Sequence, residues 1–217
     1  GMQGAGKGSI TAGGDVFTEF LEYTTVKTKG NVQANVILNS QVSADQKVTL
    51  TGKKGLIAGG SVHGMLGISC ITAGNMSEIR TGLHVGLKQE MMEQRIDVNE
   101  RYSKVNQELE DTVASMAKIM RVRQQSGELS EPLQKHLVEL KRRKDEIYTR
   151  CMEIKKEANA MESMVLAARE AKIRVEGNIY HGVVISIDNH DMVINRDTSF
   201  MEYQCQNGII TGTVVVV

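Results

Sequence analysis

The first stretch that could do chemistry is GMQGAGKGS, at residues 1–9, whose spacing resembles a nucleotide-binding P-loop. Gly6 and Lys7 occupy the positions of the last glycine and the lysine, which hold phosphates in such loops, and the next residue is normally a Ser or Thr that binds magnesium. Here that residue is Gly8. The segment that follows, SITAGGDVFTEF, predicts strand, turn and strand instead of the helix that a P-loop opens. We therefore expect no nucleotide site.

A second stretch, DNHD at residues 188–191, contains three side chains of the kinds that bind metals: Asp188, His190 and Asp191. Adjacent residues in a turn seldom converge on one ion without ligands from elsewhere in the chain. The remaining histidines have no Cys or Glu at metal-ligand spacing: His63, His84, His136 and His181. No nucleophile has a base near it in the sequence. We therefore predict no catalytic, cofactor-binding or metal-binding residue and no cofactor.

The three cysteines are too far apart for a redox or zinc motif. Cys70, Cys151 and Cys205 are odd in number and show no C-x-x-C spacing. Disulfide and zinc frameworks use closely spaced, usually even sets of cysteines. We therefore expect free, buried thiols.

Composition limits the classes of partner. The chain has 217 residues, a formal net charge of zero, one Pro and no Trp. Without net charge, no global field attracts nucleic acid or an anionic membrane. The sequence contains no apolar run of about 18 residues and does not open with a signal peptide. We therefore expect a soluble, cytoplasmic protein that neither binds nucleic acid nor inserts into a membrane.

A repeat of 16 residues runs through the first third of the chain. ITAGGDV (10–16), VKTKGNV (26–32) and VSADQKV (42–48) each place an apolar residue six positions before a Val or similar residue. We read the anchor pairs as Ile10 and Val16, Val26 and Val32, Val42 and Val48, Val62 and Ile68, Ile79 and Val85, and Ile179 and Ile185. Between anchors, Ala12, Thr28 and Ala44 form one column, and Phe20 and Val36 form another.

Such a repeat predicts a β-solenoid of about 16-residue rungs. A unit of this length cannot bury its apolar face alone, whereas stacked units hydrogen-bond at about 4.8 Å and turn the apolar columns into a continuous core. We expect Val16, Val32 and Val48 to stack inward. The hexapeptide left-handed solenoid is excluded because the spacing does not divide into sixes. We expect the turns to place Asp15, Asn31 and Lys47 one above another.

Residues 87–176 have a different character, because they hold most of the charged side chains and almost no Gly. Apolar residues recur there in steps of four and three, from Met91 to Ile119 and from Leu133 to Val175, which is the pattern of a coiled coil. Gly127 can end the first helix, Ser130 can cap the second, and Pro132 is tolerated in its first turn. The segment therefore predicts a long antiparallel helical hairpin.

The hairpin interrupts the solenoid between two rungs. We assign residues 1–86 and 177–217 to one discontinuous solenoid domain and residues 87–176 to the inserted hairpin. Within the solenoid domain, we expect residues 10–86 and 177–210 to form a single solenoid. The fold class is therefore mainly β plus α, a parallel β-helix with an inserted antiparallel coiled-coil hairpin.

Four features together resemble a known family. They are ITAGGDV at residues 10–16, TGKKGLIAGG at 51–60, the long charged coiled coil, and GNIYHGVVISI at 177–187. Over about residues 10–205 the chain is similar to the C-terminal part of the flagellar assembly protein A family, long catalogued as a domain of unknown function. The resemblance implies a right-handed β-helix in a bacterial cytoplasmic protein, linked in some members to flagellar assembly or placement. It implies no catalytic residues.

Two classes of function remain open. The first is a non-catalytic scaffold or protein-interaction module that binds protein partners through the coiled-coil arm or the solenoid surface. The second is an enzyme or small-molecule binder with a site on the solenoid face or at the solenoid–hairpin junction. A variant of the first is a homo-oligomer that stacks end to end, as bactofilin-like filaments do, because terminal rungs have unpaired backbone edges. A ligand held by side chains from several rungs would favour the second class.

Overall fold

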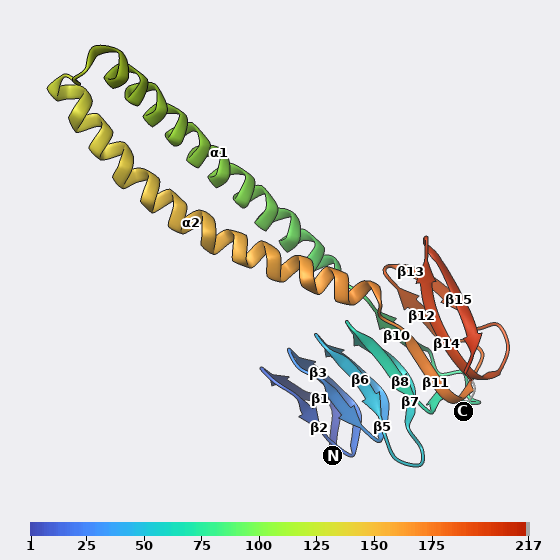
Figure 1. Cartoon of the computed structure of the whole chain (residues 1–217). Helices are drawn as coiled ribbons and strands as arrows, with labels where there is room; N and C mark the ends of the chain where they lie inside the picture. The colour runs from blue at the N-terminus through green and yellow to red at the C-terminus, as the bar shows by residue number, and fades with distance from the viewer. Residues whose placement is uncertain (216–217) are drawn as a thin grey trace. The chain divides into compact units, whose positions relative to one another are not determined.

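The computed structural model describes residues 1–215, and about 36% of the chain is helical. Figure 1 shows strands and two helices in the order β1(Met2–Ala12), β2(Val16–Phe17), β3(Phe20–Thr28), β4(Val32–Ala34), β5(Val36–Ala44), β6(Lys47–Leu50), β7(Leu56–Gly64), β8(Gly67–Cys70), β9(Thr72–Ala73), β10(Thr81–Val85), α1(Gln89–Ser126), α2(Glu131–Arg169), β11(Ile173–Ile179), β12(Val184–Ile187), β13(His190–Val193), β14(Thr198–Gln206) and β15(Ile209–Val214). The chain forms two compact units, Gly1–Lys88 with Val165–Val217, and Gln89–Met164. Each unit is described separately below.

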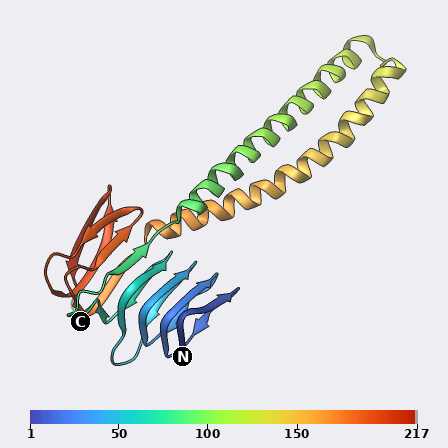
Figure 2. The ribbon, with the colours of Figure 1, turned by 180° about the vertical axis from the view of Figure 1, so that it is seen from behind.

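The first unit is a parallel β-solenoid of about four turns, as predicted. The long strands β1, β3, β5 and β7 pair side by side in parallel, and the short strands β2, β4, β6 and β8 form a second parallel row. Figure 2 shows the long strands from behind, as a row that runs from blue to green. Each rung therefore contributes one long and one short strand, separated by a turn.

The core consists of the apolar columns that the repeat predicted. One column contains Val16, Val32, Val48, Ile68 and Ile173, each paired in register with the next. Val32 and Val48 have no exposed surface. A second column contains Ile10, Val26, Val42, Val62, Leu83 and Ile185. Both columns face inward, since most of their side chains are fully buried. Their neighbours along each strand point to the opposite, outer face of the sheet.

The predicted anchors Ile79 and Val85 are wrong. The residue that pairs with Val62 is Leu83, and Ile79 is 41% exposed. The cause is a loop after β9, in which the side-chain oxygen of Asn75 accepts hydrogen bonds from the backbone N–H groups of Ser77 and Ile79. This turn lengthens the rung, so that Leu83 follows its partner Val62 by 21 residues instead of 16.

The pair Ile179 and Ile185 keeps its six-residue step but lies in other columns than the repeat implied. Ile179 pairs with Ala73, in the column of Leu21, Ile37 and Ile57, and Ile185 pairs with Leu83. Both isoleucines are fully buried. A six-residue step alone does not identify the column to which a residue belongs. The pairing of β11 with β9 and of β12 with β10 decides it for Ile179 and Ile185.

The expectation of parallel rungs to residue 210 is also wrong. β13 runs antiparallel to β12, β14 runs antiparallel to β11, and β15 runs antiparallel to β14. The turn between β12 and β13 contains Asp188 and Asn189, both with positive φ, which suits a tight hairpin. Parallel stacking therefore ends at Ile187, and antiparallel strands follow.

The column of Phe20 and Val36 exists, but it faces outward. The two residues pair in register, yet Phe20 is exposed and Val36 half-buried, whereas the neighbouring Leu21 and Ile37 are fully buried. Each long strand also bends at a residue with positive φ, which reverses the simple alternation beyond the bend. These residues are Ala5, Tyr23, Asn39 and Gly59.

The turn residues Asp15, Asn31 and Lys47 stack as predicted. A carboxylate oxygen of Asp15 accepts hydrogen bonds from the backbone and side-chain N–H groups of Asn31, at 2.7 and 3.0 Å. The side-chain oxygen of Asn31 accepts one from the backbone N–H of Lys47, at 3.1 Å. These bonds give successive turns the same conformation, and they lower the pKa of Asp15.

The second unit is an antiparallel helical hairpin. The predicted heptad positions along α1 and α2 are buried or half-buried, including Val98, Leu140 and Ile147. Ion pairs join the two helices in antiparallel order, because the partners on α2 come earlier as those on α1 come later: Arg95 to Glu162 at 3.0 Å, Arg101 to Glu157 at 2.9 Å, and Glu108 to Arg150 and Arg143 at 2.5 and 2.8 Å. The antiparallel prediction is therefore confirmed.

The turn between α1 and α2 follows the prediction, but the end of α2 departs from it. Gly127, with φ of 79°, directly follows α1, and Ser130 directly precedes α2, whose second residue is Pro132. The predicted heptads continued to Val175, but α2 ends at Arg169 and Val175 lies in β11 beside Cys70. Alternating apolar residues in IRVEGNI fit both periods over so short a stretch, and pairing with β8 decides the outcome.

Candidate functional site

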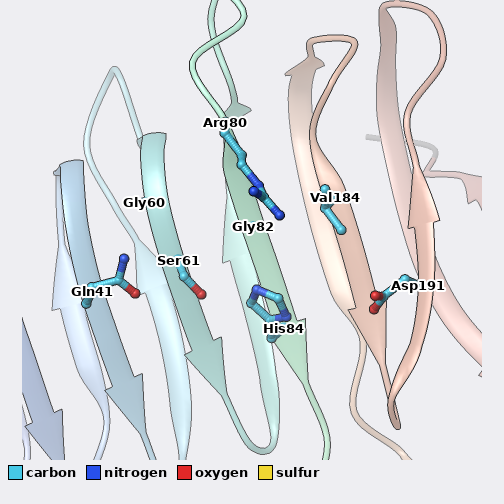
Figure 3. Close-up of a pocket in the computed structure, with 8 residues that line it drawn as sticks. All are labelled: Gln41, Gly60, Ser61, Arg80, Gly82, His84, Val184 and Asp191. Atoms are coloured by element: carbon cyan, nitrogen blue, oxygen red, sulfur yellow. The ribbon is translucent and has the colours of Figure 1, made fainter.

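A hollow of about 370 Å³ lies on the outer face of the solenoid and crosses five strands. Figure 3 shows the lining side chains on β5, β7, β10, β12 and β13. The lining residues are Gln41, Gly60, Ser61, Arg80, Gly82, His84, Val184 and Asp191. This volume is within the range of pockets that bind small ligands.

The ladder register brings these residues together. Gln41 pairs with Ser61, Ser61 with Gly82, and Gly82 with Val184. Their neighbours Val42, Val62, Leu83 and Ile185 are buried in the core, so the lining residues themselves face outward. Residues from successive rungs therefore form one row across the sheet, at intervals of about 4.8 Å.

The floor of the hollow depends on Gly82. A β-carbon at this position would lie 2.5 Å from Nε2 of His84, which is two residues further along the same strand. The imidazole of His84 therefore lies back over the glycine. A side chain at position 82 would fill the space between Ser61 and Val184 and displace the ring.

Five polar side chains around this floor have no protein partner. Within residues 1–215, no side-chain hydrogen bond or ion pair joins any of them to another protein group: Gln41, Ser61, Arg80, His84 and Asp191. Elsewhere on this unit charged groups pair readily, as Lys172 does with Glu202 at 2.9 Å. Donors and acceptors from four strands thus remain free on one hollow.

The charges in the hollow balance. Arg80 supplies a positive charge and Asp191 a negative one. Burial lowers the pKa of His84, and the nearby carboxylate of Asp191 opposes this effect only in part. A histidine with a lowered pKa is neutral at pH 7 and offers one donor and one acceptor nitrogen.

A second polar row lies two residues further along the same strands. Ser43 pairs with His63, and His63 pairs with His84. Nε2 of His63 lies 3.0 Å from the carbonyl oxygen of Gly86, while its Nδ1 and the hydroxyl of Ser43 are buried and make no hydrogen bond within the described chain. Burial lowers the pKa of His63 to about 4, and Lys88 acts in the same direction.

The DNHD stretch does not assemble a metal site. Asp191 pairs with Ser186 in the ladder, whereas Asp188 lies in the turn, where burial raises its pKa. Nδ1 of His190 lies 2.9 Å from the carbonyl oxygen of Asp188. In the part of the chain that the structure describes, no three His, Cys, Asp or Glu side chains are placed to hold a metal ion.

The P-loop-like stretch is part of strand β1. Residues 4–7 form an irregularity in the pairing of β1 with β3, and Ala5 and Gly6 have positive φ. Gly4 and Gly8 approach so closely that a β-carbon on either would overlap the other. No helix follows Lys7, so the geometry of a phosphate-binding loop is missing.

The cysteines are free, as predicted. Cys70 and Cys151 are buried, and Cys205 is half-buried. Burial raises the pKa of Cys70 to about 12, so its thiol stays protonated and inert at neutral pH.

Sequence reasoning missed a clamp around His181. Its Nδ1 lies 2.9 Å from a carboxylate oxygen of Asp197, and its Nε2 lies 3.0 Å from a carboxylate oxygen of Glu78. The backbone N–H of His181 also donates to Asp197. The hydrogen bonds to Asp197 and Glu78 raise the pKa of the imidazole. The clamp joins the loop before β10 to the turn before β12.

The helical hairpin has an exposed apolar stripe of its own. Val138, Tyr148 and Met152 of α2 are 67%, 53% and 46% exposed. At 3.6 residues per turn these three side chains lie within about 80° of one another around the helix. They occupy positions outside the heptad seam, so packing between α1 and α2 does not use them.

These features define a parallel β-solenoid with an inserted helical hairpin. The model of the family described as Flagellar Assembly Protein A beta solenoid domain matches residues 1–210. The chain therefore belongs to this family, which confirms the resemblance, and its membership suggests a role related to flagellar assembly. Members of this family and this fold are not typical enzymes. Neither the search of curated proteins nor that of solved structures gave a match.

Among the described residues, no helix combines the length and the apolar character that crossing a membrane demands. Both α1 and α2 are long, but they carry many charged side chains.

Proposed function

We propose that this protein is a non-catalytic interaction module of flagellar assembly, in which the helical hairpin binds a protein partner. The solenoid is the domain into whose sequence the hairpin is inserted. The observation that carries the proposal is the exposed stripe of Val138, Tyr148 and Met152 on α2. Apolar side chains gathered on one face mark protein interaction sites, and Tyr is enriched among the residues that dominate binding.

The stripe also indicates the chemistry of the partner. Lys141 and Lys155 fall on the same face of α2, at heptad intervals from Tyr148. A helix or groove with an apolar strip and acidic residues beside it would match this face. We propose a partner surface of this kind on another flagellar assembly protein.

Two further properties belong to the same proposal. We place the protein in the cytoplasm, and we expect it not to bind nucleic acid, since its formal net charge is zero. Cell fractionation with an antibody to the protein tests the first point. A gel-shift titration with duplex DNA and with single-stranded RNA tests the second.

The proposal is tested by affinity capture with the full-length protein from cells that produce flagella. The test variant is Tyr148→Ser with Met152→Ser, which removes apolar surface at exposed positions and leaves the heptad seam intact. The matched control is Val113→Ser with Met120→Ser, which removes exposed apolar surface from α1 instead. Captured proteins are identified by mass spectrometry.

We expect the α2 variant to lose a flagellar assembly protein that both the parent and the α1 control retain. Circular dichroism should show equal helix content in all three proteins. Retention of that partner by the α2 variant would place recognition elsewhere and contradict the role of the stripe. Capture of no flagellar protein by the parent would contradict the proposed function itself.

A further inference from the structure

The hollow on the solenoid face offers a site that the proposed function does not use. Its five unpaired polar side chains come from strands that are distant in the sequence, and they surround a floor made open by Gly82 (Figure 3). We propose that this hollow binds a neutral saccharide of one or two sugar rings.

The hydrogen-bonding groups require a polar ligand. The guanidinium of Arg80 only donates, the carboxylate of Asp191 only accepts, and the amide of Gln41 does both. The hydroxyl of Ser61 and the neutral imidazole of His84 can also act in either way. Sugar hydroxyl groups donate and accept in the same manner, so one or two rings lying along the row can meet several of these groups at once.

The charge balance favours a neutral ligand over an anion. Arg80 and Asp191 cancel, and Figure 3 shows them at different edges of the hollow. A phosphate or a second carboxylate would meet Asp191 at close range, and like charges at short distance are unfavourable. Adjacent sugar hydroxyls, in contrast, can accept two hydrogen bonds from a guanidinium. They can also donate two hydrogen bonds to the two oxygens of a carboxylate.

The floor and wall suit the apolar side of a sugar ring. Gly82 leaves space above the strands, and Val184 supplies an apolar contact beside it. The volume of about 370 Å³ accommodates a small ligand. No aromatic side chain lines the hollow, so hydrogen bonds must supply most of the affinity.

The test is ligand-observed saturation-transfer NMR with the full-length protein and separate probes. The neutral probes are glucose, galactose, mannose, N-acetylglucosamine, cellobiose and maltose. The charged probes are the anions glucuronate and glucose 6-phosphate and the zwitterionic dipeptide Ala-Ala. Each probe is titrated to about 50 mM, because small ligands of shallow sites bind weakly.

Two variants locate the binding. Arg80→Ala removes an exposed side chain, so we expect the variant to fold like the parent. Gly82→Val fills the floor of the hollow at a position whose φ is not positive, so the backbone tolerates a side chain there. The control is Arg196→Ala, because Arg196 is also exposed but lies outside the hollow. We expect the dissociation constant of a neutral sugar to rise about tenfold or more in both variants and to stay unchanged in the control.

Three outcomes would overturn the inference. Binding of only the charged probes would exclude a neutral ligand. Binding that both variants retain would place the sugar elsewhere. No binding of any probe to the parent would show that the hollow is a solvated surface. Because these measurements involve no partner protein, they succeed or fail independently of the proposed role of the helical hairpin.

Discussion

Ile173 pairs in parallel with Ile68, although the entire helical hairpin lies between them in the sequence. Both side chains belong to the column that begins with Val16, Val32 and Val48. The core therefore continues across the insertion without a break. This continuity explains how one chain can combine a repetitive β-rod with a long coiled coil.

Replacing Val32 with Asp should destabilise the solenoid strongly. Val32 is fully buried between Val16 and Val48, so the carboxylate would lose water without gaining a partner. We expect a loss of roughly 3 kcal/mol or more in the free energy of unfolding. Urea denaturation followed by circular dichroism measures it. Gln33→Asp is the control, because Gln33 is the exposed neighbour and should change stability little; equal melting of the two variants would show that the register is wrong.

The repeat predicted this core because each rung must reproduce the same inward positions. Ile10, Val26 and Val42 could be aligned from the sequence, since each lies 16 residues after the one before. Leu83 could not, because the loop that contains Asn75 adds residues and only the pairing with Val62 fixes the register. The antiparallel strands after Ile187 were missed for a related reason: alternation predicts a strand but not its direction.

Replacing Gly60 with Ala should also destabilise the solenoid. Gly60 has φ of 82°, and a β-carbon there would overlap backbone atoms of Ser40 on the neighbouring strand. We expect a cost of roughly 2 kcal/mol or more, since a left-handed backbone and a backbone clash act together. Gly13→Ala is the matched control, because a β-carbon at Gly13 would have no other atom within 4 Å. Chemical denaturation that gave the same midpoint for both would refute the tight packing at Gly60.

The clamp of His181 should make stability depend on pH. The pKa of His181 is raised above 6.5 in the folded state, so protonation favours folding. This contribution is complete below about pH 6.5 and disappears as the pH rises through the folded pKa. The melting temperature of the parent should therefore exceed that of His181→Gln at about pH 5.5, and the difference should shrink by about pH 8.5. His136→Gln, at an exposed position of the hairpin, should show no such trend, and a constant gap for His181→Gln would argue against the clamp.

The GAGKGS segment should not bind nucleotide. Lys7 lies on strand β1, no helix follows it, and Gly8 lacks the hydroxyl that holds magnesium. Titration with fluorescent ATP and GTP analogues in the presence of magnesium should give no saturable signal for the parent. Saturable binding that Lys7→Ala abolishes would reverse this assignment.

The candidate site was harder to predict than the core, for physical reasons. Sequence alone identified His84 and Asp191 as polar residues, but their joint position depends on the register of β10, β12 and β13. Arg80 follows the irregular loop, so its place beside Gly60 could not be counted from the repeat. The one local signal was Gly82, an outward-facing glycine in a row of polar residues.

Replacing residues 89–164 with a Gly-Ser linker should leave the solenoid folded and abolish partner binding. The β-unit contains its own core, and the columns of Val32 and Leu83 are closed without any residue of that segment. The hairpin in turn has its own apolar seam, including Leu137 and Leu140. A change in loop length costs only about 1 kcal/mol, because closure entropy depends weakly on length. Circular dichroism and urea denaturation of the shortened protein measure the first effect, and affinity capture measures the second. A lost β-signal would mean that the hairpin stabilises the rungs, whereas a folded solenoid that still captured the flagellar partner would transfer recognition from α2 to the solenoid surface.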